Sequence, residues 1–306
     1  MAKQKLTHKK ACRRYSIILI VQADGVCYIG SKSINILEIE ESMETEDNMN
    51  FNRLWKEFTT LPEAESIALG GSRVKQIFDE KSDYDLYIYC NEIPSENARR
   101  RILEKYCHYM ELGNSYWELE DNCTLKDGID IDILYRNLED FSPQIYSVVE
   151  EFTPSNGYTT CMWHNLLHCN ILFDKNGKLE KLQNKYQISY PEELRRNIIQ
   201  NNMNLLTGNL PSYDKQIEKV LIRKDIVSIN HRVAAFLESY FDMIFAINRL
   251  THPGEKRMIT YAKSDATILP KTFEENLNEL FKSMFNNPEN TMELIQSIII
   301  ELKKVV

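Results

Sequence analysis

The chain has 306 residues, 43% of them hydrophobic and 27% charged, which is the usage of a globular protein rather than of a collagen, a coiled coil or a disordered chain. Its formal net charge of −8 at pH 7 disfavours a general nucleic-acid coat and suits a small cationic substrate better. No apolar run approaches the roughly 18 residues that cross a bilayer, and no signal peptide is evident, so we expect a cytoplasmic protein with no membrane partner.

Seven cysteines are scattered along the chain, an odd number without a single C-x-x-C pair. They are Cys12, Cys27, Cys90, Cys107, Cys123, Cys161 and Cys169. This distribution argues against a disulfide framework and against a zinc knuckle, and it predicts reduced thiols.

Residues 1–48 are expected to form a small N-terminal module. Two apolar runs, 16–22 and 26–29, flank a short glycine-containing turn, which predicts a β-hairpin. A third strand is expected at 34–39, and the acidic stretch 38–48 has the composition of a linker. The module carries no chemistry that its residues identify.

Residues 49–152 alternate between helical and strand patterns, which predicts an α/β domain. In chain order we expect a helix at 51–58, a strand at 66–69, a short helix after Ser72, a strand at 84–89, a helix at 95–110 and an acidic strand at 129–135.

Residues 153–306 are expected to be helical throughout and to form a bundle. Pro191 at a first helical position and Asp225 as an N-cap support two of the helix starts. The helices are expected near 158–173, 191–206, 211–223, 226–249, 255–263, 271–285 and 290–304. The whole chain is therefore expected to be of the α+β class.

A Gly-Gly-Ser turn, residues 70–72, follows the apolar strand, and Asp83 and Asp85 follow it on the next strand. Side chains two apart on a strand share a face, so these two carboxylates lie side by side. At about 5 Å they repel by a few kcal/mol for an effective dielectric near 20, unless a proton or a cation lies between them. Hard oxygen ligands favour Mg²⁺ or Mn²⁺ over zinc.

A further carboxylate can come from the strand at 129–135, where Asp130 and Asp132 share a face. The amides at the start of the helix after the turn, together with the Ser72 hydroxyl, would hold phosphate oxygens opposite the metal. Each feature also has an ordinary explanation. The Gly-Gly-Ser sequence could be a simple turn, and Asp130 and Asp132 could lie on the solvent-exposed face of an edge strand. The pattern itself leaves both Asp130 and Asp132 open as the third carboxylate.

The combined pattern resembles the nucleotidyltransferase superfamily, which includes polymerase-beta-like enzymes and the aminoglycoside and lincosamide adenylyltransferases. The likeness covers residues 64–136. The helical half, with His164, His168, Tyr190-Pro191 and the segment 252–257, is similar to a bacterial subgroup with an uncharacterised C-terminal helical domain. The resemblance implies a catalytic α/β domain with a mixed sheet over 49–152 and a helical substrate or partner domain over 153–306.

The resemblance also implies roles for individual residues. Asp83, Asp85 and Asp132 would hold Mg²⁺ or Mn²⁺ and carry catalysis. A second group would contact the triphosphate of an NTP, with ATP as the expected nucleotide: Gly70, Gly71, Ser72, Arg73 and Lys256. Lys256 follows a Pro-Gly turn together with Arg257, and such a turn is also a common solvated helix start.

The activity implied is transfer of a nucleoside monophosphate, expected to be AMP, from an NTP to an acceptor hydroxyl, with an aminoglycoside- or lincosamide-like antibiotic as the candidate acceptor. One alternative is a toxin- or defence-type enzyme that modifies tRNA or a protein, and another is an inactive nucleotide-binding module. Glu238 is a candidate base. It shares a helix side with His231, Asp242 and Arg249, and that side could equally be an ordinary solvent-exposed face. His164 and His168 could share a metal, but their segment has mostly a packing pattern.

Overall fold

The computed structural model describes residues 16–23, 26–33, 46–74, 82–116 and 118–306. At the N-terminal end, β1 (Ser16–Ala23) and β2 (Val26–Ser33) pair antiparallel, as the hairpin prediction requires. The strand expected at 34–39 lies outside the described residues, as does most of the expected linker. Helix α2 (Glu46–Phe58) begins within the end of that linker.

Six strands form one mixed sheet, in the spatial order β5-β6-β7-β4-β3-β8. The central strands β4 and β7 run parallel, and the other neighbours run antiparallel. The strands are β3 (Ala64–Gly70), β4 (Tyr84–Cys90), β5 (Cys107–Asn114), β6 (Glu120–Leu125), β7 (Asp130–Arg136) and β8 (Asn170–Asp174). The prediction of an α+β chain with a mixed sheet is confirmed.

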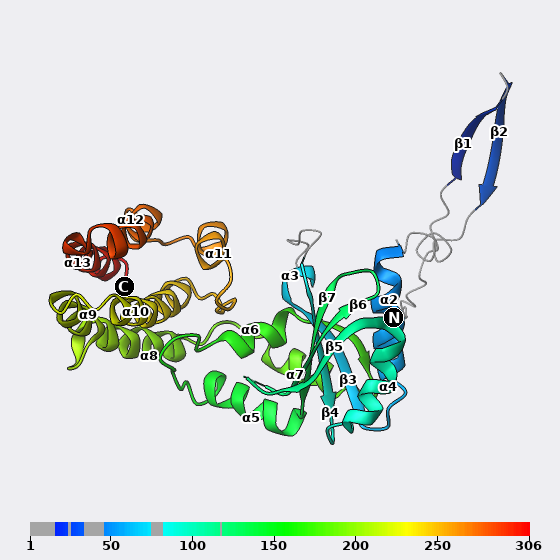
Figure 1. Ribbon diagram of the computed structural model, residues 1–306, viewed down its shortest axis with the longest axis horizontal. Helices are drawn as coiled ribbons and strands as arrows, with labels where there is room; N and C mark the ends of the chain where they lie inside the picture. The colour runs from blue at the N-terminus through cyan, green and yellow to red at the C-terminus, as the bar shows by residue number, and fades with distance from the viewer. Residues whose placement is uncertain (1–15, 24–25, 34–45, 75–81, 117) are drawn as a thin grey trace, which may run out of the picture.

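Helices α2 and α4 (Glu96–Tyr106) cover one face of the sheet (Figure 1). Leu54, Leu103 and Ile88 are completely buried in that layer. Each such side chain contributes about 1.5–3 kcal/mol when it leaves water. The start of α4 is fixed by Ser95, whose side chain accepts a hydrogen bond from the backbone N–H of Ala98.

The opposite face of the sheet packs on α5 (Leu138–Val149), α6 (Cys161–His168) and α7 (Lys178–Tyr186). Ala68, Tyr87 and Tyr89 point to this side, because strand side chains alternate between the two faces. Asp85 precedes Tyr87 by two residues and therefore faces the same side.

The rest of the chain forms a helical bundle that shares its core with that second face (Figure 1). Its long central helix is α10 (Ile226–Ile247), whose first turn is capped by Asp225, which accepts a hydrogen bond from the N–H of Ser228 at 3.1 Å. The helices are α8 (Glu192–Met203), α9 (Tyr213–Ile222), α10 (Ile226–Ile247), α11 (Met258–Asp265), α12 (Phe273–Asn286) and α13 (Thr291–Lys303). A π-helical turn, η1 (Asn204–Gly208), follows α8, and a short 3-10 turn, η2 (Pro288–Asn290), precedes α13.

Two expectations about secondary structure are wrong, and one side chain of the helix that carries Glu238 is buried. The helix expected at 95–110 ends at Tyr106, and the residues after it form edge strand β5 because they pair with β6. The helix expected at 158–173 ends at His168, and β8 then joins the sheet beside β3. Asp242 on α10 is not on a wet face: it is 1% exposed and accepts hydrogen bonds from the backbone N–H and the hydroxyl of Thr159.

Within the described part of the chain, none of the helices has the length and apolar character needed to span a bilayer.

Candidate functional site

The register of three central strands brings a glycine and two aspartates into one row. Gly70 at the end of β3 pairs with Asp85 on β4, and Asp85 pairs in turn with Asp132 on β7. Neighbouring strands lie about 4.8 Å apart, so the two carboxylates start from adjacent backbone positions on the same face. Asp83 stands two residues before Asp85, where the chain enters β4.

The register places Asp132, and not Asp130, beside Asp85. Asp132 accepts a hydrogen bond from Asn122 Nδ2 at 2.7 Å, which holds its carboxylate near the sheet. Asp130 is exposed and accepts a hydrogen bond from the hydroxyl of Thr124 at 2.8 Å.

The electrostatics of Asp85 reflect this crowding. Burial, and then the negative charges of Asp83 and Asp132, raise the pKa of Asp85 to about 6, while the positive charge of Lys256 opposes the shift. The ionised form of Asp85 is therefore costly unless a positive charge comes close.

The turn between β3 and α3 (Gly71–Val74) lies directly against this carboxylate. Gly71 has a φ of 69°, and a Cβ added there would overlap Asp85 Oδ2 and lie 2.8 Å from Asp85 Cγ. A Cβ on Gly70 would lie 3.0 Å from Cζ of the Tyr87 ring. Neither position has room for a side chain, because Tyr87 and Asp85 lie too close. The backbone of the turn therefore faces the acidic residues without a side chain in between. The role predicted for the Ser72 hydroxyl falls outside the described side chains.

Arg73 fastens the loop that carries Asp83. Its Nε donates to the carbonyl oxygens of Ser82, at 2.8 Å, and of Asp83, at 3.2 Å. Its guanidinium also lies 4.0 Å from the centroid of the Tyr84 ring. The sequence carries no signal for this positioning role. It predicts a contact between Arg73 and phosphate instead, and that contact stays a prediction.

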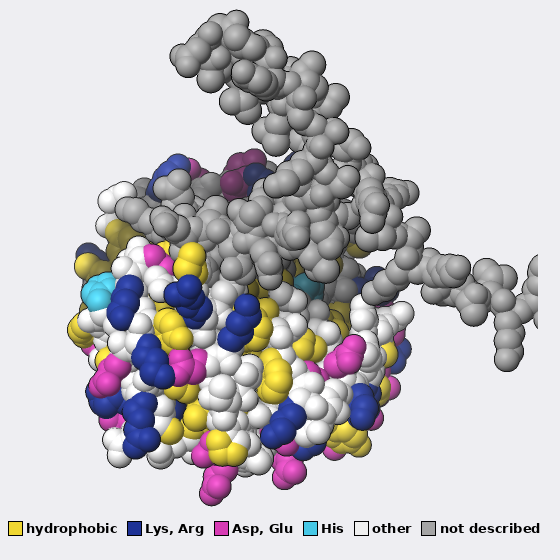
Figure 2. Space-filling model, turned by 90° about the vertical axis from the view of Figure 1, so that its right-hand side faces the viewer, with side chains coloured by type: hydrophobic (Ala, Val, Ile, Leu, Met, Phe, Trp, Pro, Cys, Tyr) yellow, Lys and Arg dark blue, Asp and Glu magenta, His cyan; other side chains and the backbone are white. Residues whose placement is uncertain are grey.

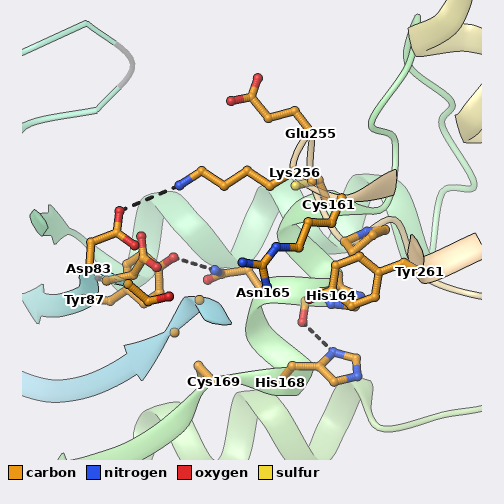
Figure 3. A pocket seen from close by; sticks show the side chains of 17 residues that line it. Asp83, Tyr87, Cys161, His164, Asn165, His168, Cys169, Glu255, Lys256 and Tyr261 are labelled. Carbon is orange, nitrogen blue, oxygen red and sulfur yellow. Dashed lines mark hydrogen bonds and ion pairs between the residues drawn. The ribbon is translucent and has the colours of Figure 1, made fainter. Parts of the chain in front are cut away.

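A cavity of about 580 Å³ opens beside the acidic residues (Figure 3). One wall contains Gly70 and Asp85 of the sheet, with Gly71 and Asp83 directly beside the strand ends. The opposite wall comes from α6 and from the loop that precedes α11, residues 253–257. Lys256 on this loop reaches across the cavity, with its Nζ 3.7 Å from Asp83 Oδ2. Lys256 is predicted to contact phosphate, and the structure places it on the helical half of the chain, opposite the carboxylates.

Asn165 joins α6 to the sheet at the base of the cavity. Its Nδ2 donates to the Tyr87 hydroxyl at 2.8 Å, and its Oδ1 accepts from Arg136 Nη1 at 3.0 Å. Arg136 is buried and forms an ion pair with Glu118, and its guanidinium lies 4.2 Å from the centroid of the Tyr87 ring. Asn165 stands where a zinc-binding helix of the H-E-x-x-H type carries glutamate, and this difference is the sequence signal for a structural role.

The two histidines of α6 are engaged locally. His164 Nδ1 lies 2.7 Å from the Thr251 hydroxyl, and His168 Nδ1 lies 2.8 Å from the carbonyl oxygen of His164. Across the described residues, no three or more His, Cys, Asp or Glu side chains come together closely enough to hold a metal ion.

The chemistry of the acidic residues nevertheless fits a hard divalent cation. Their donors are carboxylate oxygens, which Mg²⁺ and Mn²⁺ prefer, and the raised pKa of Asp85 is the effect that a cation relieves. The carboxylate of Asp83 is directed at Lys256 instead. Metal binding by Asp83, Asp85 and Asp132 stays a prediction.

Glu238 lies apart from these residues. Its Cβ packs beside Gly157, where an added Cβ would come within 2.9 Å, and it is not among the residues that line the cavity. Burial raises the pKa of Glu238. Its role as a base stays a prediction of the sequence.

The model of a domain of unknown function, DUF4037, matches residues 158–258. This segment includes α6 and the loop with Lys256, so it supplies the helical wall of the cavity. No curated protein matches the chain significantly.

Several solved structures are similar to the chain. A nucleotidyltransferase-like protein from Exiguobacterium sibiricum 255-15 is 12% identical over 85% of this chain and 74% of its own, with a TM-score of 0.39. An aminoglycoside 6-adenyltransferase from Bacillus subtilis is 13% identical over 86% and 92% of the two chains, with a TM-score of 0.27. A spectinomycin adenyltransferase from Enterococcus faecialis, solved with ATP and spectinomycin, is 12% identical over 84% and 98%, with a TM-score of 0.29.

Proposed function

We propose that the protein transfers a nucleoside monophosphate, with ATP as the first donor to test, to a hydroxyl of a small acceptor and releases pyrophosphate. The observation that carries the proposal is the row of Gly70, Asp85 and Asp132 on adjacent strands. Gly70, Asp85 and the nearby Asp83 line a cavity of about 580 Å³, and Asp132 lies behind this wall as the strand neighbour of Asp85. The glycine turn that could bind phosphate and the carboxylates that could bind a cation therefore lie on the same cavity.

Each residue has a role in this reaction. The backbone of Gly71 and the start of α3 would bind phosphate oxygens, and Lys256 and Arg257 would contact the phosphates from the opposite wall. Asp83, Asp85 and Asp132 would hold Mg²⁺, which when bound supplies charge neutralisation and polarisation of the phosphate oxygens.

In this reaction the protein positions the reactants and stabilises charge, and it forms no covalent bond to the substrate. The acceptor oxygen forms a bond to the α-phosphorus, the bond from that phosphorus to the bridging oxygen breaks, and pyrophosphate leaves with the bonding pair. The acceptor hydroxyl gives its proton to a base or to water. Charges and backbone N–H groups that are already in place around the phosphates would stabilise the charge that develops during transfer.

Pyrophosphate release by the purified protein tests the proposal. The assay uses each of the four NTPs with MgCl₂ and a panel of small hydroxyl compounds that includes aminoglycosides and lincosamides. We expect the double variant Asp83→Asn/Asp85→Asn to lose activity by about 10²-fold or more, as expected for removing preorganised charge at a reacting phosphate. Asp130→Asn is the matched control because Asp130 is exposed and pairs with Thr124. Unchanged turnover in the double variant would remove the site.

A second assay decides the class of acceptor. ATP labelled on the α-phosphate is incubated with the protein and, separately, with the small-molecule panel, total RNA and cell lysate. Label on a small molecule alone supports the proposal. Label in the RNA or the protein pool would instead assign the macromolecular alternative.

A further inference from the structure

Lys256 is carried to the cavity on a loop whose base is rigidly held. His252, at the start of this loop, is completely buried, with a ring centroid 4.7 Å from that of Tyr158 and 4.8 Å from that of Phe245. Its backbone N–H donates to the Thr160 hydroxyl at 2.8 Å, and its Nδ1 accepts the N–H of Gly254 at 3.1 Å. The backbone position of Lys256 is therefore defined by the fold.

The side chain of Lys256, by contrast, is 77% exposed and extends into the cavity toward the acidic residues (Figure 3). Its Nζ lies 3.7 Å from Asp83 Oδ2. Asp83 is also the carboxylate that the proposed function assigns to the metal, so one oxygen has two candidate cations. An ammonium group cannot coordinate a metal ion, and a divalent cation bound to Asp83 would repel it at this distance.

We propose that Lys256 is the counter-cation of Asp83 and Asp85 in the nucleotide-free protein, so that a divalent cation binds there more weakly alone than together with the phosphates of a nucleotide. The inference rests on the proposed function. The phosphates bring enough negative charge to hold both cations, and the Lys256 ammonium group turns from Asp83 to a phosphate oxygen as the metal enters.

The geometry sets the size of the effect. The contact of Lys256 with Asp83 is long and exposed, and such ion pairs are weak. The ammonium group therefore lowers the affinity for the metal ion without preventing its binding. We expect neutralising Lys256 to tighten binding of a bare divalent cation by about 3- to 10-fold at low ionic strength.

The test is titration of MnCl₂ into the full-length protein, followed by calorimetry and by the electron paramagnetic resonance of free Mn²⁺, without nucleotide and with a non-hydrolysable ATP analogue. The variant is Lys256→Gln, and Lys256→Arg retains the charge. Lys263→Gln is the matched control, because Lys263 lies on the adjoining helix α11, pairs with Glu274 and does not line the cavity. Asp85→Asn identifies the binding that belongs to the acidic residues.

We expect Lys256→Gln to bind Mn²⁺ more tightly than the parent protein without nucleotide, and to gain less affinity for Mn²⁺ when the analogue is added. Lys256→Arg and Lys263→Gln should follow the parent. Equal Mn²⁺ affinity in the parent and Lys256→Gln, with binding lost in Asp85→Asn, would overturn the inference while leaving the proposed function intact. Binding that Asp85→Asn does not alter, in either state, would overturn the proposed function and the inference with it.

Discussion

Asp85 is placed where its charge destabilises the folded chain, which is common for groups that act on a ligand. Its pKa is raised from an ordinary 3.8 to about 6 by burial and by its acidic neighbours. The folded state therefore holds the proton more tightly than the unfolded state. Stability attributable to Asp85 is full below pH 3.8 and is lost as the pH rises to about 6.

Asp85→Asn should consequently stabilise the protein while abolishing its activity. A pKa difference of one between the folded and unfolded chain corresponds to about 1.4 kcal/mol, so the gain in unfolding free energy should reach roughly 2–3 kcal/mol at pH 8 and vanish near pH 4. Urea denaturation at the two pH values, in EDTA, measures it. Asp130→Asn, at an exposed carboxylate, is the control for the loss of one negative charge. A gain for Asp85→Asn that is the same at both pH values would contradict the explanation.

His252 is a positioning residue for the Lys256 loop. Burial lowers the pKa of His252 to about 3, so its ring is neutral and Nδ1 can accept the Gly254 N–H. His252→Leu removes this acceptor, and we expect KM for ATP to rise by about 5-fold, the equivalent of one hydrogen bond. His252→Asn retains an acceptor near Nδ1 and should restore most of the KM. Steady-state kinetics separate KM from kcat, and equal KM values for the two variants would contradict the role.

At the scale of elements, the β3–α3 turn demands glycine for two separable reasons. Gly71 has a positive φ, and a Cβ there would meet the Asp85 carboxylate. Gly113 on β5 also has a positive φ, of 76°, but a Cβ there would meet nothing within 4 Å. A comparison of the two positions therefore distinguishes backbone strain from displacement of Asp85.

We expect Gly71→Ala to reduce nucleotidyl transfer by about 100-fold or more, because the carboxylate must move by enough to disrupt a positioned group. Gly113→Ala should leave the rate unchanged and cost about 1 kcal/mol of unfolding free energy, because alanine resists a left-handed conformation. Pyrophosphate release and thermal unfolding of both variants measure the two effects. Equal losses of activity would show that strain alone explains the requirement.

The elements that carry the site are also those that the sequence predicts best. The apolar run before Gly70 and the alternation around Asp83 and Asp85 are local patterns, and both strands form at the expected positions. The choice of Asp132 over Asp130 depends on the register of β7 against β4, which long-range pairing fixes. Edge strands β5 and β8 escape prediction for the same reason, because pairing with β6 and β3 overrides their local preference.

The polar residues that hold the helical wall are beyond sequence reasoning. Asn165 contacts Tyr87, 78 residues away, and Asp242 contacts Thr159, 83 residues away. A helical pattern cannot separate a buried, hydrogen-bonded aspartate from one on a wet face. Lys256 can be proposed because a cation after a Pro-Gly turn is visible in the sequence, whereas its contact with Asp83 depends on how the two halves pack.

For the whole molecule, charge distribution bears on the macromolecular alternative. The net charge is −8, and on the visible part of the face in Figure 2 Lys and Arg side chains are interspersed with Asp and Glu. Two basic side chains of α4 are paired with acidic ones, Arg100 with Glu96 and Lys105 with Glu57, so their charge is partly neutralised. We expect the dissociation constant for tRNA to be no tighter than the roughly 10⁻⁴–10⁻⁶ M of non-specific binding at physiological salt. Filter binding measures it, and a nanomolar constant would favour tRNA as the acceptor.

The two halves of the chain are also joined through a common core. Ala68, Tyr87 and Tyr89 of the sheet pack in the same buried cluster as the helices of the C-terminal half. Strand β8, which follows α6, covers the edge of β3. A chain that ended at residue 152 would therefore expose both an apolar sheet face and an unpaired strand edge.

We accordingly expect the fragment 46–152 to aggregate or to remain unfolded, whereas the fragment 46–187, which retains α6, β8 and α7, should be more soluble and more cooperative in unfolding. Circular dichroism with thermal melting and size-exclusion chromatography compare the two. The physical reason is that the burial of Tyr87 and Tyr89 needs the helices that follow residue 152. A soluble, cooperatively folded 46–152 fragment would show that the sheet is independent of the helical half, and the cavity would then be a cleft between two autonomous domains.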